Sequence, residues 1–369
     1  MIKLHIVQAE YGDCFILEFG LLSSPKYILV DGGPDSVYDN HLRDHLQNIR
    51  NSGGKLELVI LSHIDEDHII GLLDLLAELR QQRANKTTET IIVNAIWHNT
   101  FSQTLGKQDN MENRLKTLII NSRGAQSTFD NTNNTVKGIG QGNQLNIAAT
   151  ALGIPVNSGM PNKFICLDDL PEPVVISDLR LRVVGPTKHN LENLRKKWVK
   201  WLDKYKETLA SADPSLAAMV DKSIPNLSSI MILAETEGKT ILLTGDGRGD
   251  HLLQGLQQAN LLTNGKLHVN VLKLPHHGSE RDVNKDFFKT VTADKYLISA
   301  NDRYGNPDLS TLRWIVEAAK EQERKIEILI TNETLATQKL EKEYNPNKYG
   351  YHLLKMNKGA HVLTLDISK

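Results

Sequence analysis

The chain has 369 residues, of which 40% are hydrophobic and 24% are charged, as in an ordinary globular protein. Its formal net charge of −1 argues against a general electrostatic attraction to nucleic acid but leaves room for local basic faces, so a nucleic-acid substrate must be argued from a specific site. No apolar segment approaches the roughly 20 residues of a membrane span, and no leader peptide is evident. We therefore expect a soluble, cytoplasmic protein.

The N-terminal part of the chain predicts strands that lead into a polar loop. Alternating apolar residues at 2–6 and an apolar run at 15–19 predict a hairpin, and residues 26–30 predict a third strand. A helix is expected over 38–50. A further apolar run then ends in Ser-His-Ile-Asp-Glu-Asp-His at 62–68, and apolar residues return at helical spacing. This string is predicted to be a loop between a buried strand and a helix.

Four side chains of that loop can bind a metal: His63, Asp65, Asp67 and His68. Beside a buried strand they would repel one another and lose hydration unless a cation or hydrogen-bond donors compensated them. Imidazole and carboxylate together suit zinc, manganese or iron(II) rather than calcium. The alternative is a solvated loop in which Asp65 or Asp67 caps the following helix, but capping accounts for one carboxylate and neither histidine.

The middle of the chain reads as an insertion. A strand over 89–97 precedes His98, which is a candidate for a further ligand or for a histidine that faces the substrate. Residues 101 to about 159 are rich in Asn, Gln, Thr and Gly, with 130–135 as the most disordered-looking part, and a helix is predicted over 142–152. We expect this insertion, taken as approximately 101–170, to lie over the active-site face.

A second predicted feature of that face is a helix over 191–209, which has an apolar side and a basic side. Three of its cations are candidates for substrate binding: Lys196, Lys197 and Lys200. The basic side is either a solvated surface or a rail that attracts a phosphate backbone near the metals. These alternatives stay open at the level of the sequence.

Two further strand ends carry polar motifs. Strands are predicted at 228–235 and 239–244, and the second ends in Thr-Gly-Asp at Asp246. The strand over 269–274 ends in Pro-His-His-Gly-Ser, which places His276 and His277 after a buried strand, where imidazoles without partners are costly. We expect one of this pair to bind a metal, with a slight preference for His277. The chain is predicted to end in a hairpin of 351–356 with 361–365.

The motifs together resemble those of the metallo-β-lactamase superfamily, whose signature is His-x-His-x-Asp-His between a strand and a helix. Asp65 stands in place of the second histidine, and Asp31-Gly32-Gly33 resembles the first motif of the family. The strings around His68 and His277 are similar to the hydrolase domain of ComEC-type DNA-uptake proteins. That branch commonly has Arg-Tyr-Gly-His-Pro where this chain has Asn306 in place of the histidine.

The resemblance implies an α/β fold, the αβ/βα four-layer sandwich, as a single domain over residues 1–369. It implies two divalent ions, zinc or manganese, that share a water and convert it into a hydroxide nucleophile. The implied metal ligands are His63, Asp65, Asp67, His68, Asp246 and His277, with His98 and His276 as further candidates. Asp31 and Asn306 would orient the site, and the predicted catalytic residues are Asp67, His276 and Ser279.

The leading hypothesis for function is therefore a soluble, metal-dependent phosphodiesterase or nuclease that acts on nucleic acid or a nucleotide phosphodiester. One alternative is hydrolysis of a small lactone, thioester or amide, which the same fold permits. Another is a metal-stabilised, non-catalytic interaction module in a multi-protein bacterial system, with a protein partner. The sequence leaves the exact substrate, the native metal and the oligomeric state open.

Overall fold

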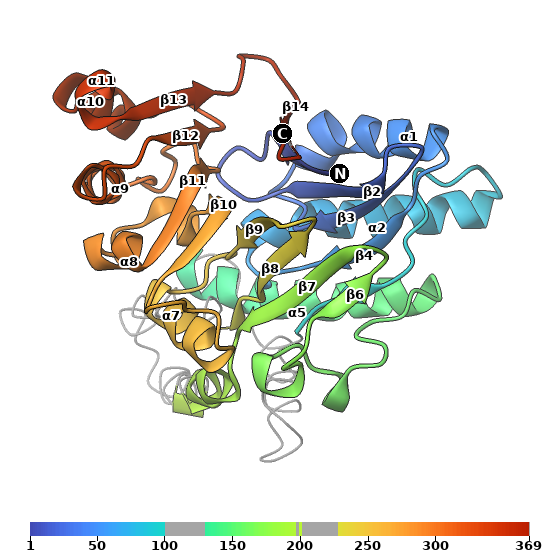
Figure 1. Cartoon of the computed structure of the whole chain (residues 1–369). Coiled ribbons are helices and arrows are strands. Elements are labelled where there is room, and N and C mark those ends of the chain that lie inside the picture. Colours follow the sequence, from blue (N-terminus) through green and yellow to red (C-terminus); the bar gives the residue numbers. More distant parts are fainter. Residues whose placement is uncertain (100–129, 197–198, 201–227, 369) are drawn as a thin grey trace.

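The computed structural model describes residues 1–99, 130–196, 199–200 and 228–368, and within them the chain forms two sheets (Figure 1). The six-stranded sheet has the order β14-β1-β2-β3-β4-β5, and the eight-stranded sheet runs from β13 to β6 in descending order. The strands of the first sheet are β1 (Ile2–Val7), β2 (Phe15–Leu21), β3 (Ser24–Val30), β4 (Leu56–Ile60), β5 (Ile96–Trp97) and β14 (Val362–Asp366). Those of the second are β6 (Val174–Ile176), β7 (Leu179–Gly185), β8 (Met231–Thr236), β9 (Lys239–Leu243), β10 (Leu267–Lys273), β11 (Val291–Ile298), β12 (Ile326–Ile330) and β13 (Tyr351–Lys355).

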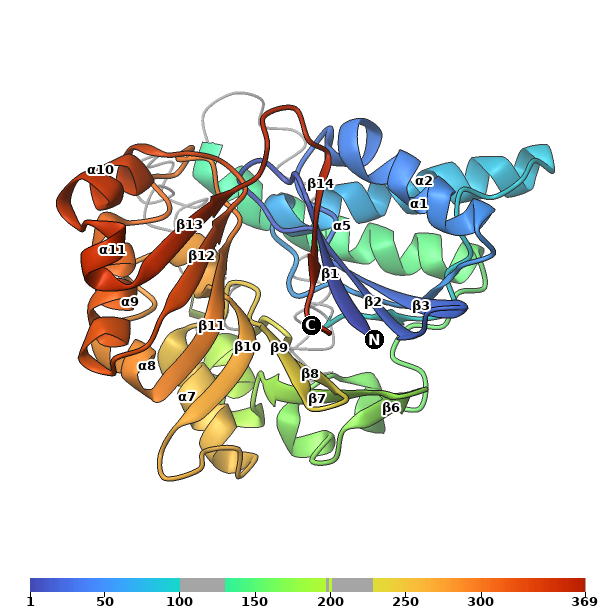
Figure 2. The ribbon, with the colours of Figure 1, turned by 45° about the horizontal axis from the view of Figure 1, so that its top comes forward.

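Helices cover the outer face of each sheet, so the described residues form four layers (Figure 2). The helices beside the first sheet are η1 (Tyr38–Leu42), α1 (Arg43–Asn51), α2 (Glu66–Asn85) and α5 (Asp130–Ala151). Those beside the second are α7 (Gly249–Gln258), α8 (Lys285–Thr290), α9 (Leu309–Glu321), α10 (Leu335–Glu343) and α11 (Pro346–Tyr349). Short helical turns are η3 (Pro161–Lys163), η4 (Leu167–Asp169) and η7 (Pro275–Gly278).

Three buried apolar clusters correspond to the three contacts between these layers. One joins the first sheet to α1, α2 and α5, and another joins the second sheet to α7, α8, α9 and α10. The third lies between the sheets, where Leu4 and Leu17 of the first sheet share a cluster with Leu181 and Val271 of the second. Alternate residues of a strand point to opposite faces, which is why Ile16 joins the outer cluster while Leu17 joins the inner one. The predicted four-layer α/β fold is confirmed.

Several predicted elements differ in the structure. The expected final hairpin is wrong, because β13 pairs in parallel with β12 in one sheet whereas β14 pairs antiparallel with β1 in the other. The strand expected over 89–97 is reduced to Ile96–Trp97, and residues 130–135, which looked disordered, lie in α5. The helix predicted over 191–209 is described only at 188–196 and 199–200. The insertion from 101 to 129 lies outside the described residues, and the assignment of one domain stays a prediction.

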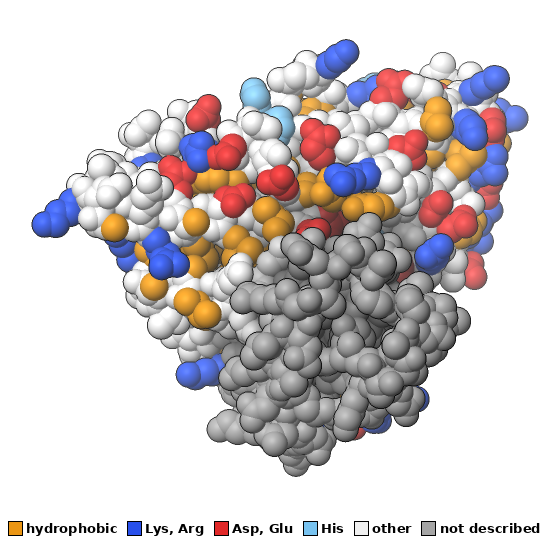
Figure 3. Space-filling model, turned by 180° about the vertical axis from the view of Figure 1, so that it is seen from behind, with side chains coloured by type: hydrophobic (Ala, Val, Ile, Leu, Met, Phe, Trp, Pro, Cys, Tyr) orange, Lys and Arg blue, Asp and Glu red, His pale blue; other side chains and the backbone are white. Residues whose placement is uncertain are grey.

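The surface agrees with the near-neutral charge of the chain. On the face shown in Figure 3, acidic and basic side chains of the described residues are interspersed. None of the described helices combines the length and the apolar composition that crossing a membrane requires.

Candidate metal centre

The candidate centre lies where turns from both sheets meet. Asp13 precedes β2, and the loop of His63 and Asp65 connects β4 to α2. From the second sheet, Asp246 follows β9 and the histidine pair follows β10. Strands β9 and β10 are parallel, so their carboxyl ends reach the same edge of the sheet. Tertiary structure thereby joins motifs that are about 180 residues apart in the chain.

Asp246 lies between four imidazole rings. Its Oδ1 atom is 3.4 Å from Nε2 of His68 and 3.3 Å from Nε2 of His277. Its Oδ2 atom is 3.8 Å from Nε2 of His63 and 3.6 Å from Nε2 of His276. The two oxygens of one carboxylate thus face two different pairs of histidines.

We call residues 62–68 the metal loop; they follow β4 and run into the first turn of α2, which contains Asp67 and His68. Each pair of histidines has a carboxylate of the metal loop beside it. Asp67 Oδ2 is 3.7 Å from Nε2 of His68 and 3.3 Å from Nε2 of His277. Asp65 Oδ2 is 3.5 Å from Nε2 of His63. The centre therefore has two halves, each with imidazole and carboxylate donors, and Asp246 is common to both.

The Nδ1 atoms of three of these histidines are fixed by hydrogen bonds on the side away from Asp246. The Nδ1–H of His68 donates to Asp31 Oδ2 at 2.9 Å, that of His277 to the Ser299 carbonyl at 2.8 Å, and that of His276 to Asp282 Oδ2 at 2.6 Å. An imidazole that donates from Nδ1 keeps the lone pair on Nε2, and such bonds fix both the tautomer and the ring orientation of metal-binding histidines. Burial lowers the pKa of these three rings, but the nearby carboxylates outweigh it and raise the pKa of each. A metal would therefore replace the proton on each Nε2, and the bond at Nδ1 holds the ring in the orientation for that exchange.

Asp31 holds the start of the metal loop in place. Its Oδ1 accepts the Ser62 backbone N–H and its Oδ2 accepts the Ser62 hydroxyl, both at 2.7 Å. The Ser62 hydroxyl also lies 3.1 Å from His63 Nδ1. Asp31 thus contacts the loop and the ring of His68 without facing Asp246 itself.

The helix-capping alternative for the loop is not what the structure shows. Asp65 occupies the N-cap position of α2, but its side chain makes no capping hydrogen bond. The carboxylates of Asp65 and Asp67 are directed to the histidines instead.

Glycines permit the close approach of the segments. Gly245 has a φ of +50°, and a Cβ atom there would lie 2.8 Å from Cβ of Ser62. A Cβ atom on Gly12 would lie 2.0 Å from the carbonyl oxygen of Asp67. Only glycine therefore lets the turns that carry Asp246 and Asp13 pack directly on the metal loop.

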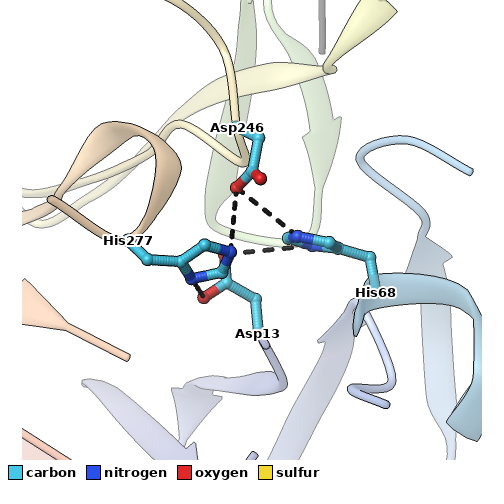
Figure 4. Close-up of side chains that lie close together, drawn as sticks. All are labelled: Asp13, His68, Asp246 and His277. Carbon is cyan, nitrogen blue, oxygen red and sulfur yellow. Dashed lines mark ion pairs between the residues drawn. The ribbon is translucent and has the colours of Figure 1, made fainter. Parts of the chain in front are cut away.

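Asp13 and Lys273 belong to the centre although the sequence motifs did not single them out. Asp13, His68, Asp246 and His277 offer ligand atoms within 4.8 Å of one another and are all buried (Figure 4). The ammonium of Lys273 forms an ion pair with Asp13, lies 3.7 Å from Asp246 Oδ1, and donates to the Gly245 carbonyl at 2.9 Å. The sequence offered one signal that could have identified Lys273, namely a charged residue inside the apolar run of β10.

The histidines of the centre lower the pKa values of its two central carboxylates, Asp246 and Asp67. Burial favours the neutral form of Asp246, but the charges of His277, His276 and His68 outweigh it and hold its pKa well below the usual range. Burial likewise opposes ionisation of Asp67, whose pKa the neighbouring His68 and His277 lower to about 2. Both carboxylates are therefore ionised at neutral pH, as metal ligands must be.

Unpartnered atoms show that the residues fit a metal. Among the described residues, the buried atoms without a hydrogen-bond partner include Nε2 of His63, His68 and His277 and Oδ1 of Asp246. Buried polar atoms are normally hydrogen-bonded, so a concentration of such atoms facing one another requires an explanation. Imidazole nitrogen and carboxylate oxygen are donors for zinc and manganese, and a bound cation would satisfy all of these atoms.

The remaining predicted site residues lie around or away from these groups. His98 is fully buried, its ring faces the backbone of Gly142 in α5, and within the described residues it forms no ion pair with the centre. The Ser279 hydroxyl accepts the Arg281 backbone N–H at 3.4 Å, and the Asn306 amide donates to the His276 carbonyl at 3.4 Å. Lys196 and Lys200 are exposed, and Lys196 is 3.4 Å from Glu192; Lys197 lies outside the described residues. Their role in substrate binding stays a prediction.

Comparison with known proteins supports the superfamily over part of the chain. The family model described as the metallo-beta-lactamase superfamily matches residues 9–103. No curated protein matches the chain. A solved structure described as a new diphosphatase from the PhnP family has 12% identity and a TM-score of 0.39, over 99% of this chain and 97% of its own. That level of similarity supports no conclusion about activity, and the ComEC-type branch stays a prediction.

Proposed function

We propose that this protein is a metal-dependent hydrolase that cleaves phosphodiesters. The observation that carries the proposal is the position of Asp246, whose two oxygens face separate pairs of imidazoles. A carboxylate shared in this way is suited to a centre of two divalent ions, and paired ions suit displacement at phosphorus. Zinc and manganese both agree with the mixed nitrogen and oxygen donors.

The proposal assigns ligands to each half of the centre. His68, His277 and Asp67 would hold one ion and His63, His276 and Asp65 the other, with Asp246 common to both. When bound, the ions would lower the pKa of water and neutralise charge on the phosphoryl oxygens. Asp13 adds a carboxylate on the side of His68 and His277, where His277 Nδ1 is 3.5 Å from its Oδ1.

The roles of the surrounding residues follow from their contacts. Asp31, Asp282 and the Ser299 carbonyl orient three imidazoles and set their tautomers. The side chain of His276 keeps 29% of its surface exposed, against 4% for His277, so the half of the centre at His276 is the side open to a substrate. Ser279 would bind or protonate the leaving oxygen from the same turn.

The proposal is tested by cleavage of single- and double-stranded DNA, RNA and bis-nitrophenyl phosphate with added manganese or zinc. We expect the wild type to cleave at least one of these and the Asp246→Asn variant to lose at least about 100-fold in rate. The matched control is Asp250→Asn, because that carboxylate bonds Arg248 at the surface. Equal cleavage by Asp246→Asn and the wild type would refute the proposal, as would ester or lactone turnover that exceeds phosphodiester turnover in the same metal-loaded preparation.

A further inference from the structure

A guanidinium and two tyrosine rings form a cluster outside the ligand set. The Arg303 guanidinium carbon is 4.2 Å from the centre of the Tyr11 ring and 5.7 Å from that of Tyr304. The two rings meet edge to face, with centroids 5.4 Å apart and an interplanar angle of 88°. We call Tyr11, Arg303 and Tyr304 the aromatic clamp.

Both segments that carry the clamp also build the metal centre. Tyr11 lies two residues before Asp13, whose backbone N–H donates to the Asp67 carbonyl at 3.1 Å. On the other side, the loop that bears Arg303 and Tyr304 is attached to the histidine turn. Asn306 donates to the His276 carbonyl, and the Asp308 N–H donates to the Gly278 carbonyl at 3.1 Å. The clamp is therefore fixed to the centre from two directions.

The loop of the clamp is also ordered internally. The Asp302 N–H donates to the Asn306 carbonyl at 3.1 Å, and the Gly305 N–H donates to the Asp302 carbonyl at 3.0 Å. The Asn301 amide donates to Glu10 at 3.1 Å, which joins the loop to the segment of Tyr11. A preorganised loop spends less conformational entropy when it binds a ligand.

Two features of the clamp indicate a ligand. Within the described residues, no carboxylate lies at ion-pair distance from Arg303, and its guanidinium contacts the tyrosine rings instead. Tyr304 keeps 63% of its surface exposed, although its ring is held by Tyr11 and Arg303. An available guanidinium can bind phosphate bidentately, and an exposed, supported ring is a stacking surface for a base.

We propose that the aromatic clamp is a nucleotide-binding subsite beside the metal centre. Arg303 binds a phosphate of the substrate, Tyr304 stacks on a nucleobase, and Tyr11 supports both side chains. The inference rests on the proposed function and names its substrate class, a phosphodiester that carries a nucleoside, rather than a lipid or sugar phosphodiester. Base stacking is tolerant of sequence because every base has a π-face, so the subsite selects nucleotides without selecting one base.

The test is equilibrium binding of adenosine 5′-monophosphate and ribose 5-phosphate to the metal-loaded protein by calorimetry. Both probes carry a phosphate, and only the first carries a base. We expect the wild type to prefer the first probe by about 10-fold, which is within the range for one stacked base. Tyr304→Leu should lose that preference and keep its affinity for ribose 5-phosphate, whereas Tyr304→Phe should retain it. Arg303→Gln should lower the affinity for both probes by a similar factor.

The matched control is Arg313→Gln. Arg313 of α9 also lies over a tyrosine ring, 5.9 Å from the centre of Tyr344, but it is paired with Glu343 of α10. This variant should bind both probes as the wild type does. Unchanged melting temperatures of the clamp variants would show that the loop still folds.

The outcomes separate this inference from the proposed function. If Tyr304→Leu keeps the preference for adenosine 5′-monophosphate, or if the wild type has none, the subsite is overturned even when Asp246-dependent phosphodiester cleavage is present. If base-dependent binding is lost in Tyr304→Leu and retained in Tyr304→Phe, the subsite stands even when no phosphodiester is cleaved, and the proposed function alone fails.

Discussion

Asp13 and Lys273 form an ion pair in which each side chain keeps only 1% of its surface exposed. The pair joins the turn before β2 in one sheet to the end of β10 in the other. Lys273 also approaches Asp246, so its positive charge offsets part of the negative charge that gathers at the centre. Each partner would be costly to bury alone.

Removal of one partner should therefore destabilise the fold strongly. We expect Asp13→Asn to lower the free energy of unfolding by about 3–5 kcal/mol, because Lys273 stays buried without its closest carboxylate. The double variant Asp13→Asn/Lys273→Met should recover much of this loss, because both charges are gone. Urea denaturation measures both effects. The control is Arg313→Gln, which breaks an exposed pair with Glu343 and should change stability little. If Asp13→Asn and Arg313→Gln lost equal stability, burial of the Asp13–Lys273 pair would not be the cause.

Gly245 is predicted to be irreplaceable because its φ is positive and because a Cβ atom there would collide with Ser62. A pair of variants can separate these two effects. Gly238 also has a positive φ, of +73°, but a Cβ atom there meets nothing within 4 Å. Gly238→Ala should therefore cost about 1–2 kcal/mol from backbone strain alone. Gly245→Ala adds the contact with Ser62, so it should cost more and lower the metal content of the purified protein. Metal analysis and urea denaturation of both variants test this. Equal losses of stability and equal metal content in the two variants would show that the contact with Ser62 has no effect.

Asp282 should control metal affinity through His276. Its carboxylate accepts the Nδ1–H at 2.6 Å, and loss of such a partner typically lowers metal affinity by about 10- to 100-fold. We expect this reduction for Asp282→Ala, with partial recovery in Asp282→Asn, whose amide oxygen can still accept the bond. Competition with a chelator measures the affinity. Asp250→Ala serves as the surface control, and an Asp282→Ala variant with wild-type affinity would remove His276 from the ligand set.

His45 should make stability depend on pH. Burial lowers its pKa from 6.5 to about 4, with His5 adding to the effect and Glu18 opposing it. The unfolded chain then binds more protons than the folded one between these values, so the stabilisation is complete above about pH 6.5 and is lost as the pH falls toward 4. Because the ring is partly exposed, we expect His45 to account for about 1 kcal/mol of the loss between pH 7 and pH 5.

The comparison variant for that prediction is His45→Gln, which cannot take up a proton at this position. Its free energy of unfolding should fall less between the two pH values than that of the wild type. His352→Gln, which changes an exposed histidine of β13, should follow the wild type. Parallel pH profiles for all three proteins would show that His45 does not contribute.

The four-layer arrangement was implied by the resemblance of the motifs to a known superfamily. The sequence by itself determined most of the strands and the metal loop. Those features depend on local information, since alternating apolar residues specify strands and the spacing of His63, Asp65, Asp67 and His68 is fixed within one loop. The Thr-Gly-Asp and His-His turns were also recognisable, because each follows a buried strand. Periodicity could not reveal which strands pair, and for this reason β13 and β14 were expected in one hairpin when they lie in different sheets.

Only the tertiary structure decided how the centre is divided and supported. Asp246 meets two pairs of histidines because turns from both sheets converge at one edge, and no spacing in the sequence encodes that convergence. The same holds for the buried pair of Asp13 and Lys273 and for the bond from His276 to Asp282. The packing of the two sheets determines which distant charged residues become partners. For this reason the pairing of an aspartate in a turn with a lysine in a strand exists only in the folded chain.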